Sequence, residues 1–415
     1  MTPTSEFHIS QQTEKLERLW QIAFSEGFPL ALWQLPQSTE KQLIIDLSGS
    51  TLRTKTDLEE LPSGFVMSPF QGESLFLRGD LYYRFDSNNQ EIEDELQGNS
   101  LQASIFEKKY IDYSKPLSAI KASKANKSQT RKSTISKSEQ GFESIYSESI
   151  FSKMVSEAIE VIEGGALQKV VLSRTKTHTL PESFEVIEAF QKLCRAYPNA
   201  FISLVYLPEF EAIWLGATPE TLVSVDAQGM FKTMSLAGTQ SAIAENGTML
   251  SPNDIRWSGK EIEEQAFVSR YIIECFKKIR LREYFERGPK TVQAGNLMHL
   301  RTDYKVDTKA VNFPQLGTVM LELLHPTSAV CGMPKPLALE VIAQQELHQR
   351  EFYSGFLGPV NIQQESHLFV NLRTVKIEGS HATFFAGCGI TGDSNPSKEW
   401  FETEMKCQTL MNVIL

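Results

Sequence analysis

The stretch Ala386–Lys406 reads AGCGITGDSNPSKEWFETEMK, and its character changes twice along its length. It continues the apolar run ATFF, so its beginning predicts the end of a buried strand, with glycines at Gly387, Gly389 and Gly392. Such glycines let a ligand approach the backbone closely and leave N–H groups free for an anion. The polar segment that follows predicts a turn, and a helix is expected from about Ser397 to the C-terminus.

Two pairs of carboxylates have helical spacing. Glu399 and Glu402 are three residues apart on the final predicted helix, and Glu261 and Glu264 have the same spacing on an earlier one. Residues at i and i+3 share one helical face, so each pair can aim two carboxylates at one point. Facing acidic pairs would repel unless a hard cation lay between them, and oxygen ligands favour Mg²⁺. The same spacing is also common on solvated helices, so the pattern alone leaves both interpretations open.

Basic residues interrupt apolar segments. Lys169 lies in LQKVVLSRT, and Arg373 lies in FVNLRTVKI, which is read as one strand. A buried charge without a partner is costly, so such a lysine is either an edge residue that reaches water or a base. Lys406 follows Glu402 by one helical turn and would present a cation beside the predicted metal. His325 lies in a loop rich in proline and glycine, where a lone histidine is more often structural than catalytic.

The order of the predicted elements sets the fold class. Helices are expected over residues 10–25, 142–165, 183–197, 260–279 and 335–353, and short strands such as ALWQL, FISLVYL and SGFLGPVNI lie between them. There is no regular strand–helix–strand alternation, which predicts an α+β fold with large antiparallel sheets packed against helices. Residues 1–113 are expected to be a divergent part of the same fold. Residues 114–141 are Ser/Lys-rich and read as a linker or surface loop, and 142–415 as the catalytic region.

Composition excludes several classes of protein. The 415 residues are 41% hydrophobic and 22% charged, with a net charge of −10, which argues against nucleic acid or an anionic membrane as the main partner. The five cysteines are scattered without a CxxC motif, which predicts free, mostly buried thiols in a reducing compartment. The N-terminus lacks an apolar signal-peptide core, and no apolar run approaches roughly 18 residues. A cytoplasmic location is expected.

From about Phe142 to the C-terminus the chain resembles the chorismate-utilising enzymes. The matching blocks, in family order, are KVVLSR, GATPETL, LAGT, KEIEEQ, LMHLRT, LHPTSAVCG, REFYSGFLGPV, LRT and AGCGITGDSNPSKEWFETEMK. The family includes anthranilate synthase component I, aminodeoxychorismate synthase component I, isochorismate synthase and salicylate synthase. The resemblance implies the fold of anthranilate synthase component I, the substrate chorismate and the cofactor Mg²⁺.

The resemblance also implies roles for single residues. Glu264 and Glu402 match the metal ligands, with Glu261 and Glu399 as supporting or additional ligands. His325 matches the active-site histidine near the substrate ring. Contacts with the substrate's carboxylates fall on the following residues: Gly238, Thr239, Tyr353, Arg373, Gly387, Gly389 and Lys406.

The position of Lys169 indicates the subclass. Relatives that add ammonia carry glutamine there, and relatives that add water carry lysine, because water is a poor nucleophile that needs a base. Glu220, at the end of GATPE, matches the general acid that protonates the departing C4 hydroxyl. Ala237 stands where aminodeoxychorismate enzymes that use a covalent lysine carry that nucleophile. These matches predict an isochorismate synthase that adds water at C2 of chorismate and releases the C4 hydroxyl, in a reversible isomerisation.

Other functions remain open at this stage. Salicylate synthase shares Lys169 and Glu220 but also eliminates pyruvate; an aminating synthase with a glutaminase partner and a non-catalytic chorismate-binding protein are weaker alternatives. The predicted reaction needs no glutaminase subunit, and such members are commonly monomers. Isochorismate feeds both menaquinone and siderophore routes, with menaquinone as the default. The chain departs from the family at Gln265, where histidine is frequent, and at Gln240, where arginine is frequent.

Overall fold

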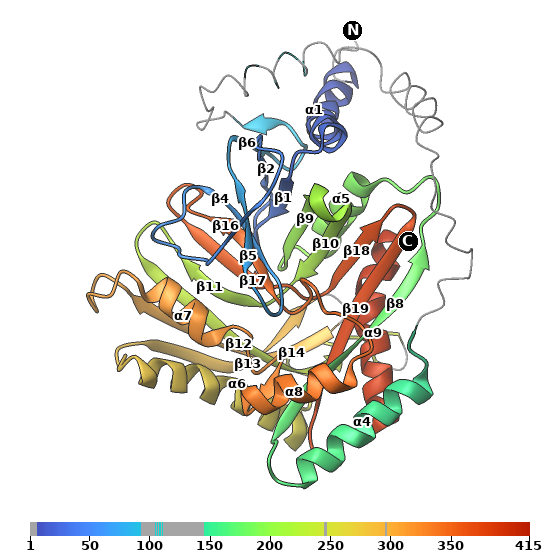
Figure 1. Ribbon diagram of the computed structural model, residues 1–415, viewed down its shortest axis with the longest axis vertical. Coiled ribbons are helices and arrows are strands. Elements are labelled where there is room, and N and C mark those ends of the chain that lie inside the picture. Colours follow the sequence, from blue (N-terminus) through green and yellow to red (C-terminus); the bar gives the residue numbers. More distant parts are fainter. Residues whose placement is uncertain are drawn as a thin grey trace.

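The structure is a computed structural model that describes residues 6–92, 104, 106, 108, 110 and 145–415, except 245–246 and 295–296. The Ser/Lys-rich segment 114–141 lies outside these residues. The described strands form two antiparallel sheets, which together with the flanking helices confirm the α+β prediction. Figure 1 shows the sheets at the centre of the molecule with helices outside them.

The larger sheet has ten strands among the described residues. In spatial order they are β15 (Gly332–Met333), β8 (Lys169–Thr179), β19 (His381–Ile390), β18 (Thr374–Glu378), β10 (Ala212–Thr218), β9 (Phe201–Leu207), β1 (Leu30–Gln34), β2 (Lys41–Ile45), β6 (Leu81–Phe85) and β7 (Glu91–Ile92). The described part of the second sheet has nine strands: β13 (Phe285–Ala294), β14 (Leu297–Asp307), β12 (Met230–Ser241), β11 (Thr221–Val225), β17 (Ser366–Val370), β16 (Phe356–Val360), β4 (Gly64–Ser68), β5 (Ser74–Arg78) and β3 (Leu52–Thr54). Strands from the N-terminal part and from the rest of the chain therefore share both sheets.

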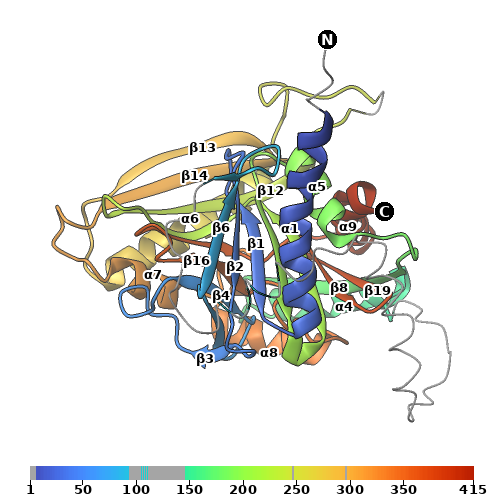
Figure 2. The ribbon, with the colours of Figure 1, turned by 90° about the horizontal axis from the view of Figure 1, so that it is seen from above.

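Two groups of helices cover the sheets. One group packs on the ten-stranded sheet and consists of α1 (Glu6–Glu26), α5 (Val186–Ala196) and α9 (Pro396–Ile414). In the other group, α6 (Gly259–Lys278) and α7 (Leu316–Leu324) pack on the nine-stranded sheet, whereas α4 (Glu148–Glu163) and α8 (Lys335–Gln345) pack on β8 and its neighbours at one end of the ten-stranded sheet. Figure 2 shows α1, α5 and α9 on one side of the sheets and α6 and α7 on the other. All five cysteines are free and buried, as expected.

A third core fills the space between the two sheets and is dominated by aromatic rings. Phe201 of the larger sheet stacks on Phe369 of the smaller one, with ring centroids 4.1 Å apart. Trp214 is 1% exposed and stacks on Phe385 at 5.4 Å. Truncation of such a ring to alanine typically costs about 3–5 kcal/mol. The two sheets therefore form a rigid base for the residues at their edges.

Two expectations about elements were wrong, and both corrections concern positions near the site. The predicted helix over 335–353 ends at Gln345, because the next residue, Glu346, turns inward. The Glu346 carboxylate forms a buried ion pair with Arg350 at 2.6 Å and accepts hydrogen bonds from the backbone N–H and the hydroxyl of Ser173. This tertiary network outweighs the helical propensity of the segment.

The run HLFVNLRTVKI is not one strand. Its first half ends as β17 in the smaller sheet, and its second half begins as β18 in the larger sheet. Arg373 lies at the crossing between them with a φ of 47°. This is the left-handed backbone region, which residues other than glycine rarely adopt. Arg373 is therefore a crossing residue and not a charge within a strand.

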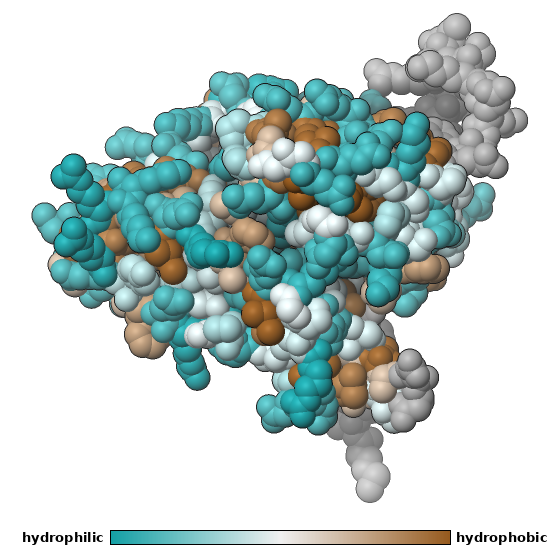
Figure 3. Space-filling view, turned by 90° about the horizontal axis from the view of Figure 1, so that it is seen from below, coloured by the Kyte–Doolittle hydropathy of each residue, from teal (hydrophilic) through white to brown (hydrophobic). Residues whose placement is uncertain are grey.

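The outer surface is mainly polar. On the face seen in Figure 3, hydrophilic side chains predominate, and apolar ones gather in a few separate patches. Across the described residues, every helix is too short or too polar to cross a lipid bilayer.

Candidate active site

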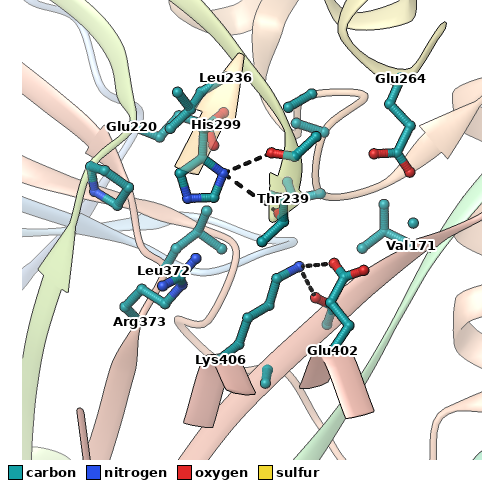
Figure 4. A pocket seen from close by; sticks show the side chains of 18 of the residues that line it. Val171, Glu220, Leu236, Thr239, Glu264, His299, Leu372, Arg373, Glu402 and Lys406 are labelled. Atoms are coloured by element: carbon teal, nitrogen blue, oxygen red, sulfur yellow. Dashed lines mark hydrogen bonds and ion pairs between the residues drawn. The ribbon is translucent and has the colours of Figure 1, made fainter. Parts of the chain in front are cut away.

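One pocket collects side chains from both sheets and from two helices. Figure 4 shows its centre, with Glu264 and Glu402 on one side and Glu220, His299 and Arg373 on the other. Its lining residues are Lys169, Val171, Pro219, Glu220, Leu236, Ala237, Gly238, Thr239, Glu264, His299, Ala329, Val330, Tyr353, Leu372, Arg373, Phe385, Ala386, Gly387, Gly389, Glu402 and Lys406. Most residues predicted from the sequence therefore meet in one cavity.

Two helices bring the metal-ligand candidates Glu264 and Glu402 together. Helix α6 begins with a capping box in which Ser258 and Glu261 bond each other's backbone, and α9 begins with Asn395 as its N-cap. Each start sets the phase of its helix, so Glu264 from α6 and Glu402 from α9 reach the same side of the pocket (Figure 4). Burial raises the pKa of Glu264, and the nearby Glu402 carboxylate raises it further.

The other member of each pair has a different role. Glu261 accepts hydrogen bonds from the backbone N–H and the hydroxyl of Ser258, so it serves the start of the helix. Glu399 is buried and forms an ion pair with Lys260, whose Nζ lies 2.6 Å from Glu399 Oε1. Neither Glu261 nor Glu399 lines the pocket. The expectation that spacing alone aims both carboxylates of a pair at one point is therefore wrong.

Lys406 neutralises one side of the acidic pair. Its ammonium lies 2.7 Å from Glu402 Oε1 and donates a hydrogen bond to the carbonyl of Gly387 at 2.8 Å. Burial alone would raise the pKa of Glu402, but the Lys406 ion pair outweighs it and the pKa lies below its ordinary value. The sequence spacing of one helical turn predicted this juxtaposition correctly.

Lys169 begins β8 and is 3% exposed. On the neighbouring strand β19, Gly389 pairs with Val171, two residues along β8, and a Cβ atom on Gly389 would lie 3.2 Å from both Lys169 Nζ and Glu264 Oε1. The amine and the carboxylate thus converge on the same point above the glycine, which leaves them room. Lys169 is therefore aimed into the pocket and not at bulk solvent.

Glu220 lies where the chain passes from β10 in one sheet to β11 in the other. This crossing is tied to the Arg373 crossing, because Val370 N–H donates to Glu220 O at 3.0 Å and the Thr218 hydroxyl donates to Val370 O at 2.6 Å. Burial raises the pKa of the Glu220 side chain to about 8, although Lys169 and Lys406 oppose the rise. This carboxyl is therefore mostly protonated at neutral pH and can donate a proton.

Arg373 and Tyr353 form another wall of the pocket. Arg373 Nη1 donates to the Thr409 hydroxyl at 3.1 Å, and no carboxylate lies within ion-pair distance of its guanidinium among the described residues. The Tyr353 ring stacks on Phe385 with centroids 5.4 Å apart, which joins it to the core between the sheets. A guanidinium with spare donors in a buried pocket suits a ligand carboxylate.

A bulge in β12 places Gly238 and Thr239 at the pocket. The register of β12 against β14 shifts between Ala237 and Gln240, and Gly238 has a φ of 69°. Bulges of this kind redirect side chains next to binding sites. The Gly238 carbonyl then faces the ring of His299.

His299 was missed at the sequence level, although LMHLRT contains a lone histidine in an apolar strand. Its Nδ1 lies 2.8 Å from the Gly238 carbonyl, so Nδ1 carries the proton and Nε2 is an acceptor. Nε2 is buried and has no hydrogen-bond partner among the described residues. Burial, with Arg373 nearby, lowers the pKa of His299 to about 3, so the ring is neutral.

His325 does not line the pocket, in contrast to the role implied by resemblance. It ends α7, and its ring packs edge-to-face on Phe356 with centroids 4.9 Å apart. The surrounding loop turns this ring toward the core beneath the smaller sheet, so the structure assigns it packing.

The two departures from the family pattern occupy different places. Gln265 is buried, and its Nε2 donates to the hydroxyls of Ser235 at 2.8 Å and Thr302 at 3.0 Å, which ties α6 to β12 and β14. Gln240 donates to the carbonyl of Arg256 at 2.9 Å. Neither side chain lines the pocket.

The donor set fits a hard divalent cation that is only partly held by the protein. Among the described residues, no group of three or more His, Cys, Asp or Glu side chains is placed to hold an ion. Glu264 and Glu402 lie on the same side of the pocket and turn their carboxylates toward one another (Figure 4). An ion with two carboxylate ligands takes its remaining ligands from water and from a bound substrate, as Mg²⁺ commonly does.

Residues 94–415 match the family described as chorismate binding enzyme. The chain belongs to this family. Isochorismate synthase EntC of Escherichia coli K12 is 29% identical over 274 residues, which cover 65% of this chain and 68% of that protein. The salicylate biosynthesis isochorismate synthase of Pseudomonas aeruginosa is 30% identical over 270 residues, covering 63% and 53%.

A solved structure has the same fold as this chorismate-binding chain. MenF, the menaquinone-specific isochorismate synthase from Escherichia coli, superposes with a TM-score of 0.69 at 20% identity and covers 96% of this chain and 91% of that one. This confirms the fold expected from the sequence.

Proposed function

We propose that this protein is an isochorismate synthase, which converts chorismate to isochorismate reversibly with Mg²⁺ as cofactor. The observation that carries the proposal is the meeting of Lys169 and Glu220 in the pocket that also contains Glu264 and Glu402. This set contains a base candidate, a protonated acid and a place for a divalent cation. The named relatives EntC and MenF support the same reaction.

Substrate binding is proposed to use the separate charges of the pocket. Glu264 and Glu402 would hold a Mg²⁺ ion, which would supply Lewis-acid polarisation of the substrate's ring carboxylate. Arg373 offers its guanidinium to the carboxylate of the enolpyruvyl side chain, with the Tyr353 hydroxyl beside it. His299 Nε2, which has no partner among the described residues, accepts a hydrogen bond from a substrate hydroxyl.

The chemistry consists of paired proton transfers. Lys169 takes a proton from a water molecule, and the water oxygen forms a bond to C2 of the ring. The double bonds shift, the C4–O bond breaks, and Glu220 gives its proton to the departing hydroxyl, which leaves as water. One water enters and one leaves, so the reaction is an isomerisation. The roles of Lys169 and Glu220 reverse in the other direction.

Environment sets these two roles apart. The pKa of Glu220 near 8 keeps the acid protonated at neutral pH. Lys169 lies on the β8 side of the pocket beside Glu264, whereas Glu220 lies at the crossing between the sheets. An acid and a base held by different elements can act on different carbons of one ring, and each contributes typically about 10²–10⁴-fold in rate.

The decisive experiment is a product assay with chorismate as the only organic substrate, with and without Mg²⁺. We expect isochorismate to form only with Mg²⁺, and chorismate to form from isochorismate in reverse. Salicylate fluorescence would replace this proposal with salicylate synthase, and a requirement for ammonium would indicate an aminating enzyme. Binding of chorismate without consumption would reject an enzymatic role.

A further inference from the structure

The ion pair between Lys260 and Glu399 joins the two helices that carry the metal-ligand candidates. Lys260 is the second residue of α6, Glu399 lies in the first turn of α9, and Nζ and Oε1 are 2.6 Å apart. The Glu399 side chain is 2% exposed and that of Lys260 is 27% exposed. The pair therefore lies at the edge of the site, with its anion buried and its cation partly open to water.

Lys260 interacts with more than its immediate partner. Burial lowers the pKa of its ammonium, but the carboxylates of Glu399, Glu264 and Glu402 outweigh burial and raise the pKa above its ordinary value. All three carboxylates therefore stabilise the positive charge of Lys260, while Glu264 and Glu402 disfavour each other's ionisation. In the absence of a metal ion, Lys260 offsets part of this repulsion.

We propose that Lys260 is an internal counter-ion of the acidic site, and that its charge weakens divalent-cation binding to the substrate-free protein. The inference rests on the proposed function, because it takes Glu264 and Glu402 as the metal ligands. A fixed positive charge beside a divalent cation raises the free energy of the bound state. Glu399 has the opposite effect, since it neutralises Lys260 locally.

This account predicts changes of opposite sign for the two partners. Lys260→Met removes the repelling charge and exposes the site to Glu399, so Mg²⁺ binds about tenfold more tightly. Glu399→Gln leaves Lys260 unneutralised beside the site, so Mg²⁺ binds about tenfold more weakly. The double variant removes both charges and returns the affinity to within about threefold of the wild type. A mere mechanical link between α6 and α9 would instead weaken binding in all three variants.

The test is calorimetric titration of MgCl₂ into the substrate-free, full-length protein, with the Mg²⁺-induced rise in melting temperature as a second readout. Lys153→Met is the matched control, because Lys153 pairs with Glu157 on the exposed face of α4. We expect that control to match the wild type. If Lys260→Met fails to fold, Lys260→Gln removes the same charge with a polar side chain and carries the sign test.

The outcomes separate this inference from the proposed function. Mg²⁺ binding by the wild type with the signed series supports the inference. Mg²⁺ binding with all variants equal to the wild type, or all weakened, overturns the counter-ion role and leaves the metal site intact. Failure of the wild type to bind Mg²⁺ at any concentration tested overturns the counter-ion role and the Mg²⁺ requirement together.

Discussion

Replacing the proposed acid, Glu220→Gln, is expected to cost activity and add stability. Glutamine keeps the shape of a protonated carboxyl but cannot give up a proton, so we expect kcat for isochorismate formation to fall roughly 10²–10⁴-fold. Wild-type activity should also decline as pH rises through about 8, where the Glu220 side chain ionises. The variant should lack this decline.

The gain in stability follows from the same pKa. The pKa of this carboxyl is about 8 in the folded protein, against 4.5 for a glutamate side chain exposed to water. Between pH 4.5 and about pH 8 the folded protein keeps a proton that the unfolded chain has lost. The free energy of unfolding is therefore greatest below pH 4.5 and falls as the pH rises toward 8. The loss is about 1.4 kcal/mol for each unit of pH. Above pH 8 the variant should therefore be more stable than the wild type by on the order of 5 kcal/mol.

The assay is urea denaturation of both proteins between pH 4.5 and pH 9, with product formation measured on the same samples. The two curves should coincide at the acid end and separate as pH rises. Glu404→Gln provides a control of opposite sign, because Lys176 and Arg174 overcome burial and lower the pKa of Glu404. The Glu404→Gln variant should be less stable than the wild type at neutral pH, and this difference should disappear on acidification. A Glu220→Gln protein that is less stable than the wild type at pH 8.5 would refute the reasoning.

Four further outcomes are expected. Lys169→Gln should abolish water addition and retain Mg²⁺-dependent chorismate binding by calorimetry; near-normal isochorismate output would reject its role as base. Glu402→Ala should lose activity and Mg²⁺ stimulation together, and full stimulation of that variant would contradict the ligand assignment. Arg373→Lys should raise KM for chorismate about 10–100-fold with a smaller effect on kcat, because a point charge replaces a fork of donors; an unchanged KM would exclude the contact. His299→Gln should reduce kcat at least about tenfold. His325→Gln should lower the melting temperature and leave kcat within about twofold of the wild type. The reverse pattern would assign the active-site role to His325.

Parts of the site could be predicted from the sequence where helical spacing alone determines which side chains meet. Glu402 and Lys406 are one helical turn apart, and that spacing alone brings their charges together. Gly389 and Lys169 could be flagged from residue type, but only the pairing of β19 with β8 places the glycine under the amine. Resemblance to a family assigned most of the remaining roles and misassigned His325.

The failures share a cause. Glu261 and Glu399 have the same spacing as their partners, yet a capping box takes one and Lys260 takes the other. His299 and His325 are equally plausible candidates from the sequence, but His299 lies at the bulge around Gly238 and contacts the carbonyl of that glycine. Competing partners contributed by distant segments are not visible in a local pattern.

The amino-acid order by itself determined the class of the fold, the starts of α6 and α9, and the presence of Lys169 in an apolar strand. These properties depend on hydrophobic periodicity, capping residues and residue type, which act over a few positions. Tertiary structure alone decided that the chain crosses between the two sheets at Glu220 and again at Arg373, with hydrogen bonds joining the crossings. The burial that raises the pKa of Glu220 and the neighbours that surround Lys260 arise only when both sheets and both helices are in place, because desolvation and Coulomb interactions depend on distance in space.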